Sequence, residues 1–523
     1  MNAFYYVERA TRRFQIFLFL ATFVSLSACK KNAQQPTPET TKEVQSLSFK
    51  MSNNPGLLTD LIGDIKGDTI FVNAFAGTNI KALVADFSIK GQKVTVNGET
   101  QQSGVTTVNF SDILTYTVVG EDGRIKNYFI KFTDNGIPAL YVNTTNGVAV
   151  TSKEVYLTGT IKTVSNFNVS SATLAMEVKG HGNSTWGDFA KKPYKIKLDK
   201  KTSILGMPAT KSWILLANAA DKSLIRNELA LALSRSIGRP HTVDSRYVEL
   251  FLNGEYRGSY QLAQQVKEGI VGIEDQKSTS TTLPDISGGY LIEQDLFPTA
   301  EPVYFRTAKN MPFVVKYPDE DVNQQQKDYI KAHFQKIEDA LFATTFTDPV
   351  NGYRKYFDVD GYVDYYLINE VIGNPDVFRS TYMYKKRNDD KVYIGPIWDF
   401  DKAANNDNRL GDQVNGLMLT SAFEPKIWIK RMMQDPNFRQ KIRSRWNELK
   451  PKIMAVPGAI VPLAKKLAYS QVYNFTMWDI LKKKSYLELQ VNGSYDGEIQ
   501  YLKTFMTNHI TWLDSKFNSA EYQ

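Results

Sequence analysis

Two aspartates that stand two positions apart are the first residues in the chain whose type and spacing could do chemistry. Asp399 and Asp401 end the segment IGPIWDFD, in which bulky apolar residues lead up to the acids. If an apolar strand persists through this segment, both side chains point to the same face. The pair could belong to a surface turn, or its oxygens could bind Mg²⁺ or Mn²⁺. Because Trp398 and Phe400 favour a segment fixed in the core, we expect the two acids to bind metal.

The sequence excludes several other chemistries. Its four histidines form no HExxH pair, and it contains no G-x-S-x-G elbow, Walker A loop or G-x-G-x-x-G motif. A single cysteine excludes disulfides within the chain and thiolate metal sites. The remaining glycines, lysines and carboxylates are the groups that phosphoryl transfer uses to hold phosphates, bind metal and orient the attacking hydroxyl.

Eight motifs stand in an order that is typical of one family. They run over roughly residues 138 to 450 and are GHGNSTW, KKPYKIKLD, DKSLIRNELA, VELFLNGEYRGSYQLAQQVK, GGYLIEQD, NEVIGNPD, GPIWDFD and DPNFRQKIRSRWNEL. Together they resemble the CotH family, the spore-coat-type atypical protein kinases. The resemblance implies a two-lobed kinase-like fold that binds ATP with Mg²⁺ or Mn²⁺. It also implies phosphorylation of Ser or Thr on a protein substrate.

The resemblance assigns the phosphate contacts to a loop of small residues and to a basic strand. Backbone N–H groups of small residues can approach phosphate oxygens closely, although the loop could also be an ordinary β-turn. The loop residues are Gly180, Gly182, Asn183 and Ser184. Lys195 and Lys197 share one face of the following strand, either at the site or at a solvated edge. Of the two, we favour Lys197 as the lysine that neutralises the ATP phosphates.

Three further positions take their roles from the resemblance. Asp376, in GNPD, is the acid that accepts or orients the proton of the attacking hydroxyl, and Asp399 is the metal-binding aspartate. Arg226 would lie on a small-lobe helix and hold a phosphate or an acid, or it could pair locally.

The chain departs from the family pattern at two positions. Thr381 stands where relatives often carry an asparagine that binds a second metal ion, and Gln264 stands where they tend to have glutamate. Weaker metal ligands at these positions would favour a second hypothesis, a CotH-fold surface lipoprotein that has lost catalysis and binds protein or glycan. The 28 tyrosines also suit such a contact surface.

The N-terminal segment predicts export and a lipid anchor. Three arginines precede an apolar run, so residues 1–28 have the pattern of a signal peptide. The following LSAC resembles a lipobox with acylation at Cys29, which would hold the protein on a membrane. We expect a cell-envelope lipoprotein, on the outer membrane of a Gram-negative bacterium, with a flexible Pro/Thr-rich tether over residues 29–44.

The elements that must position the site follow from periodicity. Residues 45–134 contain short β-branched runs with a hairpin signal at Asp122 and Gly123, and they resemble an immunoglobulin-like β domain. In residues 138–520, strands come first and helices dominate after 321, which predicts an α+β domain with two lobes. One helix is expected over 221–238, with Asp221 as its N-cap and Gly238 as its stop.

The charge distribution argues against one class of partner. The net charge is +8, but the basic residues are spread along the chain and do not form a nucleic-acid footprint. We therefore expect no nucleic-acid partner.

Overall fold

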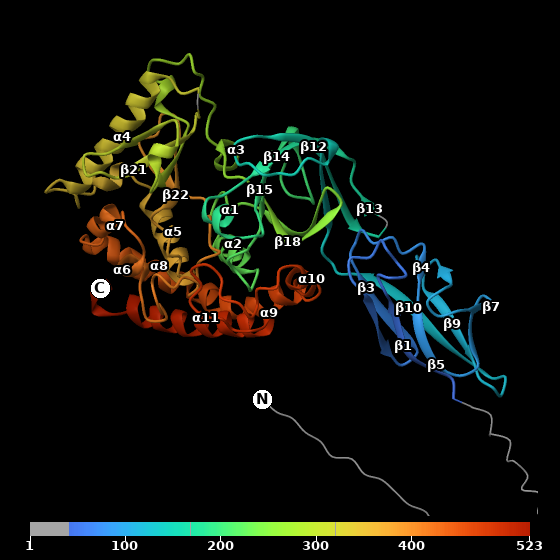
Figure 1. Cartoon of the computed structure of the whole chain (residues 1–523). Coiled ribbons are helices and arrows are strands. Elements are labelled where there is room, and N and C mark those ends of the chain that lie inside the picture. The colour runs from blue at the N-terminus through green and yellow to red at the C-terminus, as the bar shows by residue number, and fades with distance from the viewer. Residues whose placement is uncertain (1–40, 168, 320) are drawn as a thin grey trace, which may run out of the picture.

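The structure is a computed structural model that describes residues 41–167, 169–319 and 321–523. The predicted signal peptide, Cys29 and most of the predicted tether lie outside these residues. The described chain forms an all-β module, a β-barrel, and a five-stranded sheet with most of the helices, arranged along an elongated molecule (Figure 1). The predicted α+β class is confirmed.

The N-terminal module is built from ten strands. Eight of them form a sheet in the order β5-β1-β2-β3-β10-β9-β6-β7, in which β3 and β10 are parallel. Its core includes Ile70, Val72, Tyr116 and Ile130. The strands are β1 Glu43–Phe49, β2 Leu61–Lys66, β3 Thr69–Ala74, β4 Leu83–Val84, β5 Asp86–Lys90, β6 Lys93–Val96, β7 Glu99–Gln101, β8 Thr107–Val108, β9 Leu114–Val119 and β10 Ile125–Asp134. The hairpin expected at Asp122 and Gly123 joins β9 to β10.

The second region is a closed barrel. Its strands pair in the order β11-β17-β18-β16-β15-β14-β12, and β12 pairs again with β11, while β13 extends from β12. Trp213, Ile196 and Leu262 fill the interior and are fully buried. The strands are β11 Ala139–Thr144, β12 Leu157–Asn166, β13 Val169–Ser170, β14 Leu174–Gly180, β15 Tyr194–Thr202, β16 Thr210–Leu216, β17 Ser245–Leu252 and β18 Glu255–Gln264.

The third region combines a five-stranded antiparallel sheet, in the order β20-β21-β19-β22-β23, with the longer helices. The strands are β19 Tyr290–Asp295, β20 Tyr304–Arg306, β21 Pro312–Tyr317, β22 Ser380–Lys385 and β23 Val392–Ile394. The helices of the barrel and of this region are α1 Ser184–Asp188, α2 Arg226–Ser236, α3 Glu268–Val271, α4 Gln324–Phe342, α5 Val359–Ile372, α6 Met418–Ser421, α7 Ile427–Met432, α8 Pro436–Met454, α9 Val456–Lys466, α10 Ser470–Met477 and α11 Tyr495–Phe517.

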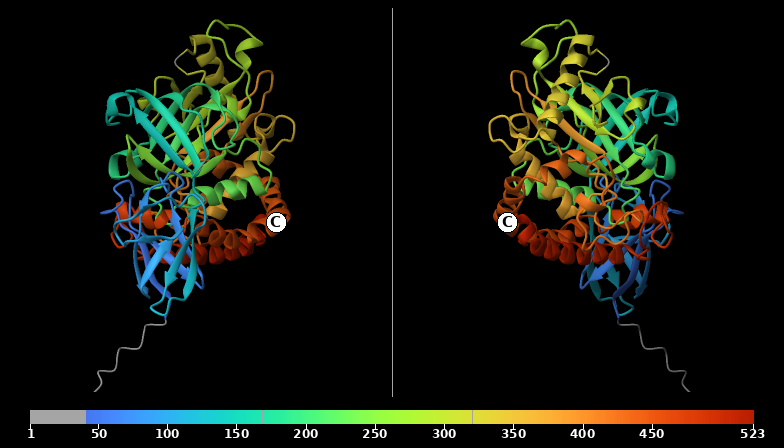
Figure 2. Two further views of the ribbon diagram at one scale, coloured as in Figure 1. Left: turned by 90° about the vertical axis from the view of Figure 1, so that its right-hand side faces the viewer. Right: turned by 90° about the vertical axis from the view of Figure 1, so that its left-hand side faces the viewer.

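The largest hydrophobic core lies between these helices and the sheet. Phe334 of α4 packs on Phe313 of β21, with ring centroids 4.6 Å apart. Trp446 of α8 is fully buried and contacts Phe517 of α11. Helices α9 and α11 run along one side of the molecule below α2, as the front and side views show (Figure 2).

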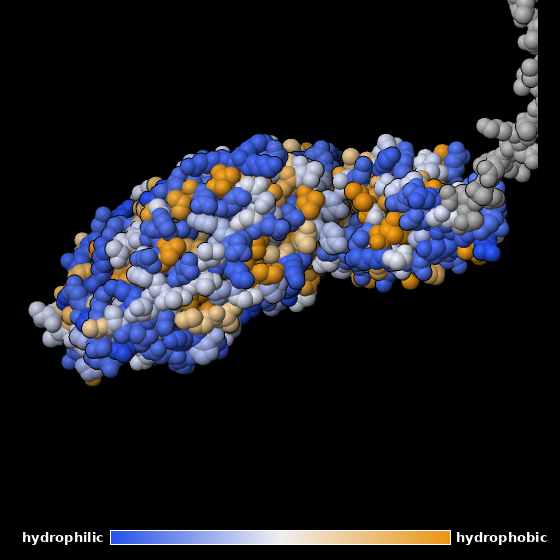
Figure 3. Space-filling model, turned by 90° about the horizontal axis from the view of Figure 1, so that it is seen from below, coloured by the Kyte–Doolittle hydropathy of each residue, from blue (hydrophilic) through white to orange (hydrophobic). Residues whose placement is uncertain are grey.

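The outer surface is mainly polar. Seen from below, apolar side chains are scattered among hydrophilic ones over the helical region and the module (Figure 3). Among the described residues, no helix combines the length and the apolar character needed to cross a bilayer.

The helix predicted over 221–238 begins later than expected. Helix α2 starts at Arg226, because the Asp221 carboxylate accepts hydrogen bonds from the backbone N–H groups of Ser223 and Arg226 and so folds residues 221–225 into a turn. Asp221 is therefore not the N-cap. Gly238 follows the helix with φ +80°, as a stop residue should.

The module is joined to the barrel and to α10 by aromatic and polar contacts. The Phe75 ring lies 5.0 Å from Tyr256 of β18 and 4.4 Å from Tyr473 of α10. Beside them, the buried Glu249 carboxylate accepts hydrogen bonds from Asn135 Nδ2 at 2.8 Å and from the Tyr256 hydroxyl at 2.6 Å. These contacts fix the module against the barrel.

We predict that Asn135→Ala destabilises the protein by about 1–3 kcal/mol, because it leaves one oxygen of a buried carboxylate without a donor. Denaturant unfolding measures this. The control Asn127→Ala removes an exposed amide that accepts from Thr117 and should cost under about 0.5 kcal/mol. Equal effects of the two substitutions would contradict the prediction.

Candidate active site

Four carboxylates converge at one end of the five-stranded sheet. Glu293 lies on β19, Asp376 in the turn after α5, and Asp399 and Asp401 in the loop after β23. The pKa of Asp399 is held well above its usual range by the protein packed around this residue and by the charges of Asp401, Asp376 and Glu293. The acids predicted at 376 and 399 thus lie near enough to interact electrostatically, although they lie far apart in the sequence.

Two members of this cluster titrate near neutral pH. Burial raises the pKa of Glu293 to about 7, and the Lys316 ammonium 3.3 Å away only partly opposes that shift. Burial also raises the pKa of Asp401 to about 6, again against a nearby cation, Lys402. Both carboxyl groups therefore keep their protons more readily than usual, and a bound cation would favour their charged forms.

The strand expected to carry Asp399 and Asp401 ends too early. Strand β23 stops at Ile394, and Gly395 follows with φ +113°. Pro396 has no N–H to continue the ladder, and Asp399 has φ +65°. The prediction that the two acids share a strand face is wrong; a loop brings them together instead.

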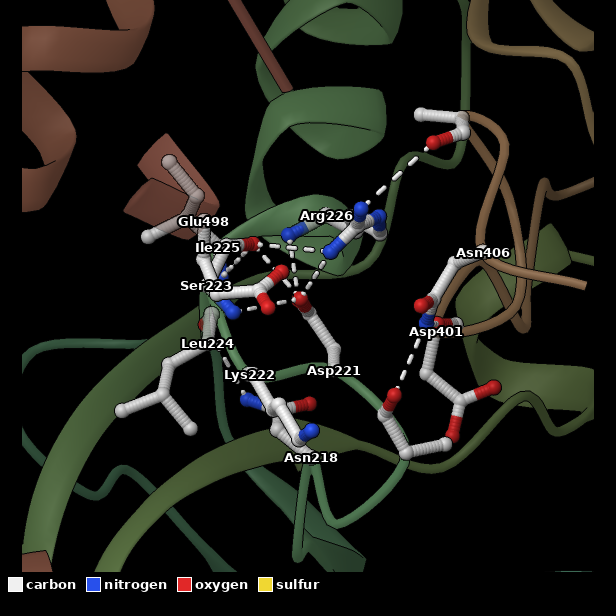
Figure 4. A network of polar contacts seen from close by, with 12 residues as sticks. Asn218, Asp221, Lys222, Ser223, Leu224, Ile225, Arg226, Asp401, Asn406 and Glu498 are labelled. Atoms are coloured by element: carbon white, nitrogen blue, oxygen red, sulfur yellow. Dashed lines mark hydrogen bonds and ion pairs between the residues drawn. The ribbon is translucent and has the colours of Figure 1, made fainter. Parts of the chain in front are cut away.

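That loop is held by the start of helix α2 (Figure 4). Arg226 is buried, forms an ion pair with Asp221, and donates from Nε to the Ala403 carbonyl at 3.0 Å and from Nη2 to the Ala404 carbonyl at 3.4 Å. Its guanidinium has no exposed edge. The structure therefore contradicts the assignment of Arg226 as a phosphate ligand and shows that it positions the loop of acids.

Two asparagines complete this support. Asn227 Oδ1 accepts from the Phe400 N–H at 2.8 Å, between the two acids. Asn406 Nδ2 donates to the carbonyls of Ala220 and Asp401, at 2.8 and 2.7 Å. The segment from Asn218 to Asn227 therefore binds the loop on both sides of Asp401.

The four residues of the predicted small-residue loop have different environments. Gly180 donates its N–H to the Ser152 carbonyl, and a Cβ there would lie 2.4 Å from the Trp186 ring. Packing, not phosphate binding, thus requires glycine at 180. Gly182 has φ +80°, Asn183 accepts from Lys153 Nζ at 3.2 Å, and Ser184 begins the short helix α1. Asn183 and Ser184 are exposed, so this part of the loop is open to a ligand.

The two candidate lysines also differ. Lys197 is exposed, and its Nζ lies 3.6 Å from Glu177 Oε2 on the neighbouring strand. Lys195 is half-buried, and burial together with the charges of Lys267 and Lys179 lowers its pKa to about 8. The charge of Lys316, which pairs with Glu293, also lowers the pKa of Lys195. The interaction with the partner of Glu293 favours Lys195 over Lys197, and the choice between the two lysines stays a prediction.

The two departures from the family pattern do not involve the carboxylates. The Thr381 hydroxyl is buried in β22, where it donates to the Val377 carbonyl at 2.5 Å. Gln264 donates to the Pro208 carbonyl and accepts from the Asp244 N–H. Both side chains are committed to backbone groups.

Sequence reasoning missed three residues of this region: Lys316, Arg379 and Arg409. Lys316 follows the buried residues Phe313, Val314 and Val315 in β21, and a charge at the end of such a run is a detectable signal. Arg379 and Arg409 lie in turns with no periodicity, so only the three-dimensional structure places them beside Asp376.

The residues present fit a divalent cation in part. Within the residues that the structure describes, no three Asp, Glu, His or Cys side chains form a ready-made metal cluster. Asp399 and Asp401 offer two neighbouring carboxyl groups whose pKa values are both raised. Mg²⁺ typically takes one or two carboxylates and completes its shell with phosphate oxygens and water, so this pair suits a metal that arrives with a nucleotide.

The barrel, the helical region and the acidic cluster beside them define an α+β protein with a carboxylate-rich site. The family model described as CotH kinase protein matches residues 178–513. Because this match covers more than half of the chain, the chain belongs to the CotH kinase family. The predicted family resemblance is confirmed.

The other comparisons add little. No curated protein matches the chain. One solved structure, a "putative glycoside hydrolase" from Bacteroides thetaiotaomicron, aligns with 42% of this chain and 60% of its own, at 15% identity and a TM-score of 0.16. A likeness this weak carries no argument.

We predict that Arg226→Ala destabilises the protein by about 3–5 kcal/mol, because it strands the buried Asp221 carboxylate. The matched control on the same helix is Arg235→Ala, which breaks a partly exposed pair with Glu228 and should cost at most about 1 kcal/mol. Denaturant unfolding distinguishes them. An Arg226 variant as stable as the Arg235 variant would show that the loop does not depend on this guanidinium.

We predict that Asp401→Asn stabilises the metal-free protein at pH 7.5 by about 1 kcal/mol. The folded-state pKa of Asp401 is about 6, against an ordinary value of 3.8. Its charge therefore opposes folding above pH 6, and this penalty fades as the pH falls toward 4. Thermal unfolding with chelator at pH 7.5 and 4.5 tests this, with the exposed Asp64→Asn as control. A gain that is absent, or the same at both pH values, would contradict it.

Proposed function

We propose that this protein is an envelope-anchored kinase that transfers the γ-phosphate of ATP to Ser or Thr of a protein substrate with Mg²⁺ or Mn²⁺. Family membership supports a kinase-like function in general. The observation that carries the specific proposal is that Asp376, Asp399 and Asp401 interact with one another in one region, with Glu293 and its partner Lys316 beside them.

Each side chain takes a role from its surroundings. Asp399 and Asp401 would hold the metal, which when bound neutralises the β- and γ-phosphate charges. Lys195 would contact the phosphates together with the loop at Asn183 and Ser184, whose residues are exposed. In this proposal the barrel acts as the small lobe of the kinase, and the helical region as the large lobe.

Asp376 would orient the acceptor hydroxyl. Burial raises its pKa, and Arg409 and Arg379 oppose that shift. A carboxylate with a raised pKa accepts a proton more readily. Asp376 would take the hydroxyl proton as the hydroxyl oxygen bonds to the γ-phosphorus and the bond from that phosphorus to ADP breaks, so that ADP leaves. Arg226 acts at a distance by keeping the loop of Asp401 in place.

The anchoring part of the proposal concerns residues outside the described chain. A signal peptide over 1–28 and acylation at Cys29 would place the protein on a membrane, as expected for an outer-membrane lipoprotein. The described module begins at residue 43 and would separate the barrel from the lipid. No nucleic-acid partner is proposed.

A second candidate function is binding of protein or glycan without catalysis. This candidate is favoured because the described part of the chain has no cluster of three metal-binding side chains. Calorimetry separates the two candidates: ATP–Mn²⁺ binding that Asp399→Ala abolishes supports the kinase. Glycan or protein binding without nucleotide binding supports the alternative.

We predict that the full mature protein transfers labelled γ-phosphate to itself or to an envelope protein, and that Asp399→Asn reduces transfer by about 100-fold or more. The paired lysine variants locate the phosphate contact. Lys195→Ala should raise the KM for ATP about tenfold, because a charged hydrogen bond to phosphate is lost. Lys197→Ala should change it less than about twofold. The reverse order would contradict the placement of Lys195.

A further inference from the structure

Two arginines stack on one aromatic ring beside Asp376. The Arg379 guanidinium lies 4.0 Å from the centroid of the Phe423 ring, and that of Arg409 lies 4.4 Å from it. The Phe423 N–H donates to the Pro375 carbonyl at 3.3 Å. The ring is therefore tied to the same turn that carries Asp376.

The two cations differ in how far they are neutralised. Arg409 binds the Asp407 carboxylate through Nε, at 2.8 Å, and Nη2, and its Nη2 lies 4.0 Å from Asp376 Oδ2. Arg379 donates from Nε to the Glu424 carbonyl at 3.3 Å. Within the described residues, Arg379 has no carboxylate at ion-pair distance. Its outer nitrogens remain available at a half-buried position.

This arrangement suits an anion better than other ligands. A guanidinium whose plane is fixed by stacking presents a fork of donors that matches a carboxylate or a phosphate. A basic substrate side chain would meet the unpaired charge of Arg379, and an apolar one would bury the free donors of Arg379. The phosphates of ATP are assigned to the lysine side of the site, so they leave this position open.

The distance to Asp376 limits where the anion can lie on the substrate. Because Asp376 would orient the acceptor hydroxyl and Arg409 lies 4.0 Å from it, an anion on these arginines stands close to the acceptor residue. An extended peptide advances about 3.3 Å per residue, so the acidic residue falls within about two positions of the acceptor.

We propose that Arg379 and Arg409, held on Phe423, form a subsite for an acidic side chain that neighbours the phosphorylated Ser or Thr of the protein substrate. This inference rests on the proposed kinase function. It makes the enzyme selective for acidic acceptor sequences.

The test compares matched peptides on the full mature protein. One peptide has a single serine flanked by glutamates, the second has glutamines there, and the third has lysines. We expect the glutamate peptide to have a kcat/KM about tenfold or more above the glutamine peptide. Arg379→Gln should reduce this ratio to about one, mainly through the KM for the glutamate peptide. The control Arg124→Gln, whose side chain is 83% exposed on the N-terminal module, should leave the ratio unchanged.

A charge-reversal variant provides a result that misfolding of Arg379→Gln could not imitate. Arg379→Glu should shift the preference toward the lysine peptide, which general damage to the site cannot do. Equal use of all three peptides by the wild type, or equal loss on all peptides in the Arg379 variants, would overturn the subsite.

A binding assay separates this proposal from the kinase function. Fluorescence anisotropy of the same peptides, without ATP, should show tighter binding of the glutamate peptide that Arg379→Gln removes. If no peptide is phosphorylated, the kinase proposal fails, and this binding difference alone decides the subsite. Equal binding of the three peptides overturns it.

Discussion

The site depends on a buried ion pair between Asp221 and Arg226. Through Arg226 the pair reaches the carbonyls of Ala403 and Ala404, so a turn before α2 determines the path of a loop almost 180 residues later. Ala404 and Asn405 both have positive φ, which non-glycine residues adopt at a cost of about 1–2 kcal/mol each. The guanidinium contributes the hydrogen bonds that keep this backbone in place. The acids of the loop can therefore remain close together although they repel one another.

The overall fold was largely predictable because it rests on local patterns. The long helices α4, α8 and α11 have an apolar face, and the turns at Gly123 and Gly254 have the residues that tight hairpins require. Closure of the barrel was not predictable, since the pairing of β11 with both β12 and β17 is a long-range property. The early end of β23 was predictable in principle from Gly395 and Pro396.

The candidate site was predictable only at the level of residue type. The motifs identified Asp376 and Asp399, but they could not separate Lys195 from Lys197, because both belong to one strand face and differ in burial and in the charges around them. Arg226 and Gly180 carried family motifs and yet serve structure: one binds a loop and the other makes room for Trp186. A motif thus marks a place in the fold, and burial and hydrogen bonding then distinguish a residue that contacts ligand from one that supports it.

The junction at Phe75 and Glu249 has a consequence for the proposed attachment to a membrane. Since Phe75 contacts both β18 and α10, the module packs against the barrel, and the described chain begins at the far end of the module (Figure 1). In the proposed lipid-anchored protein, the module would add a fixed length between the end of the flexible tether and the carboxylates. The tether and the module together would set the range of heights above the bilayer at which the site meets other proteins, so height would select substrates alongside sequence.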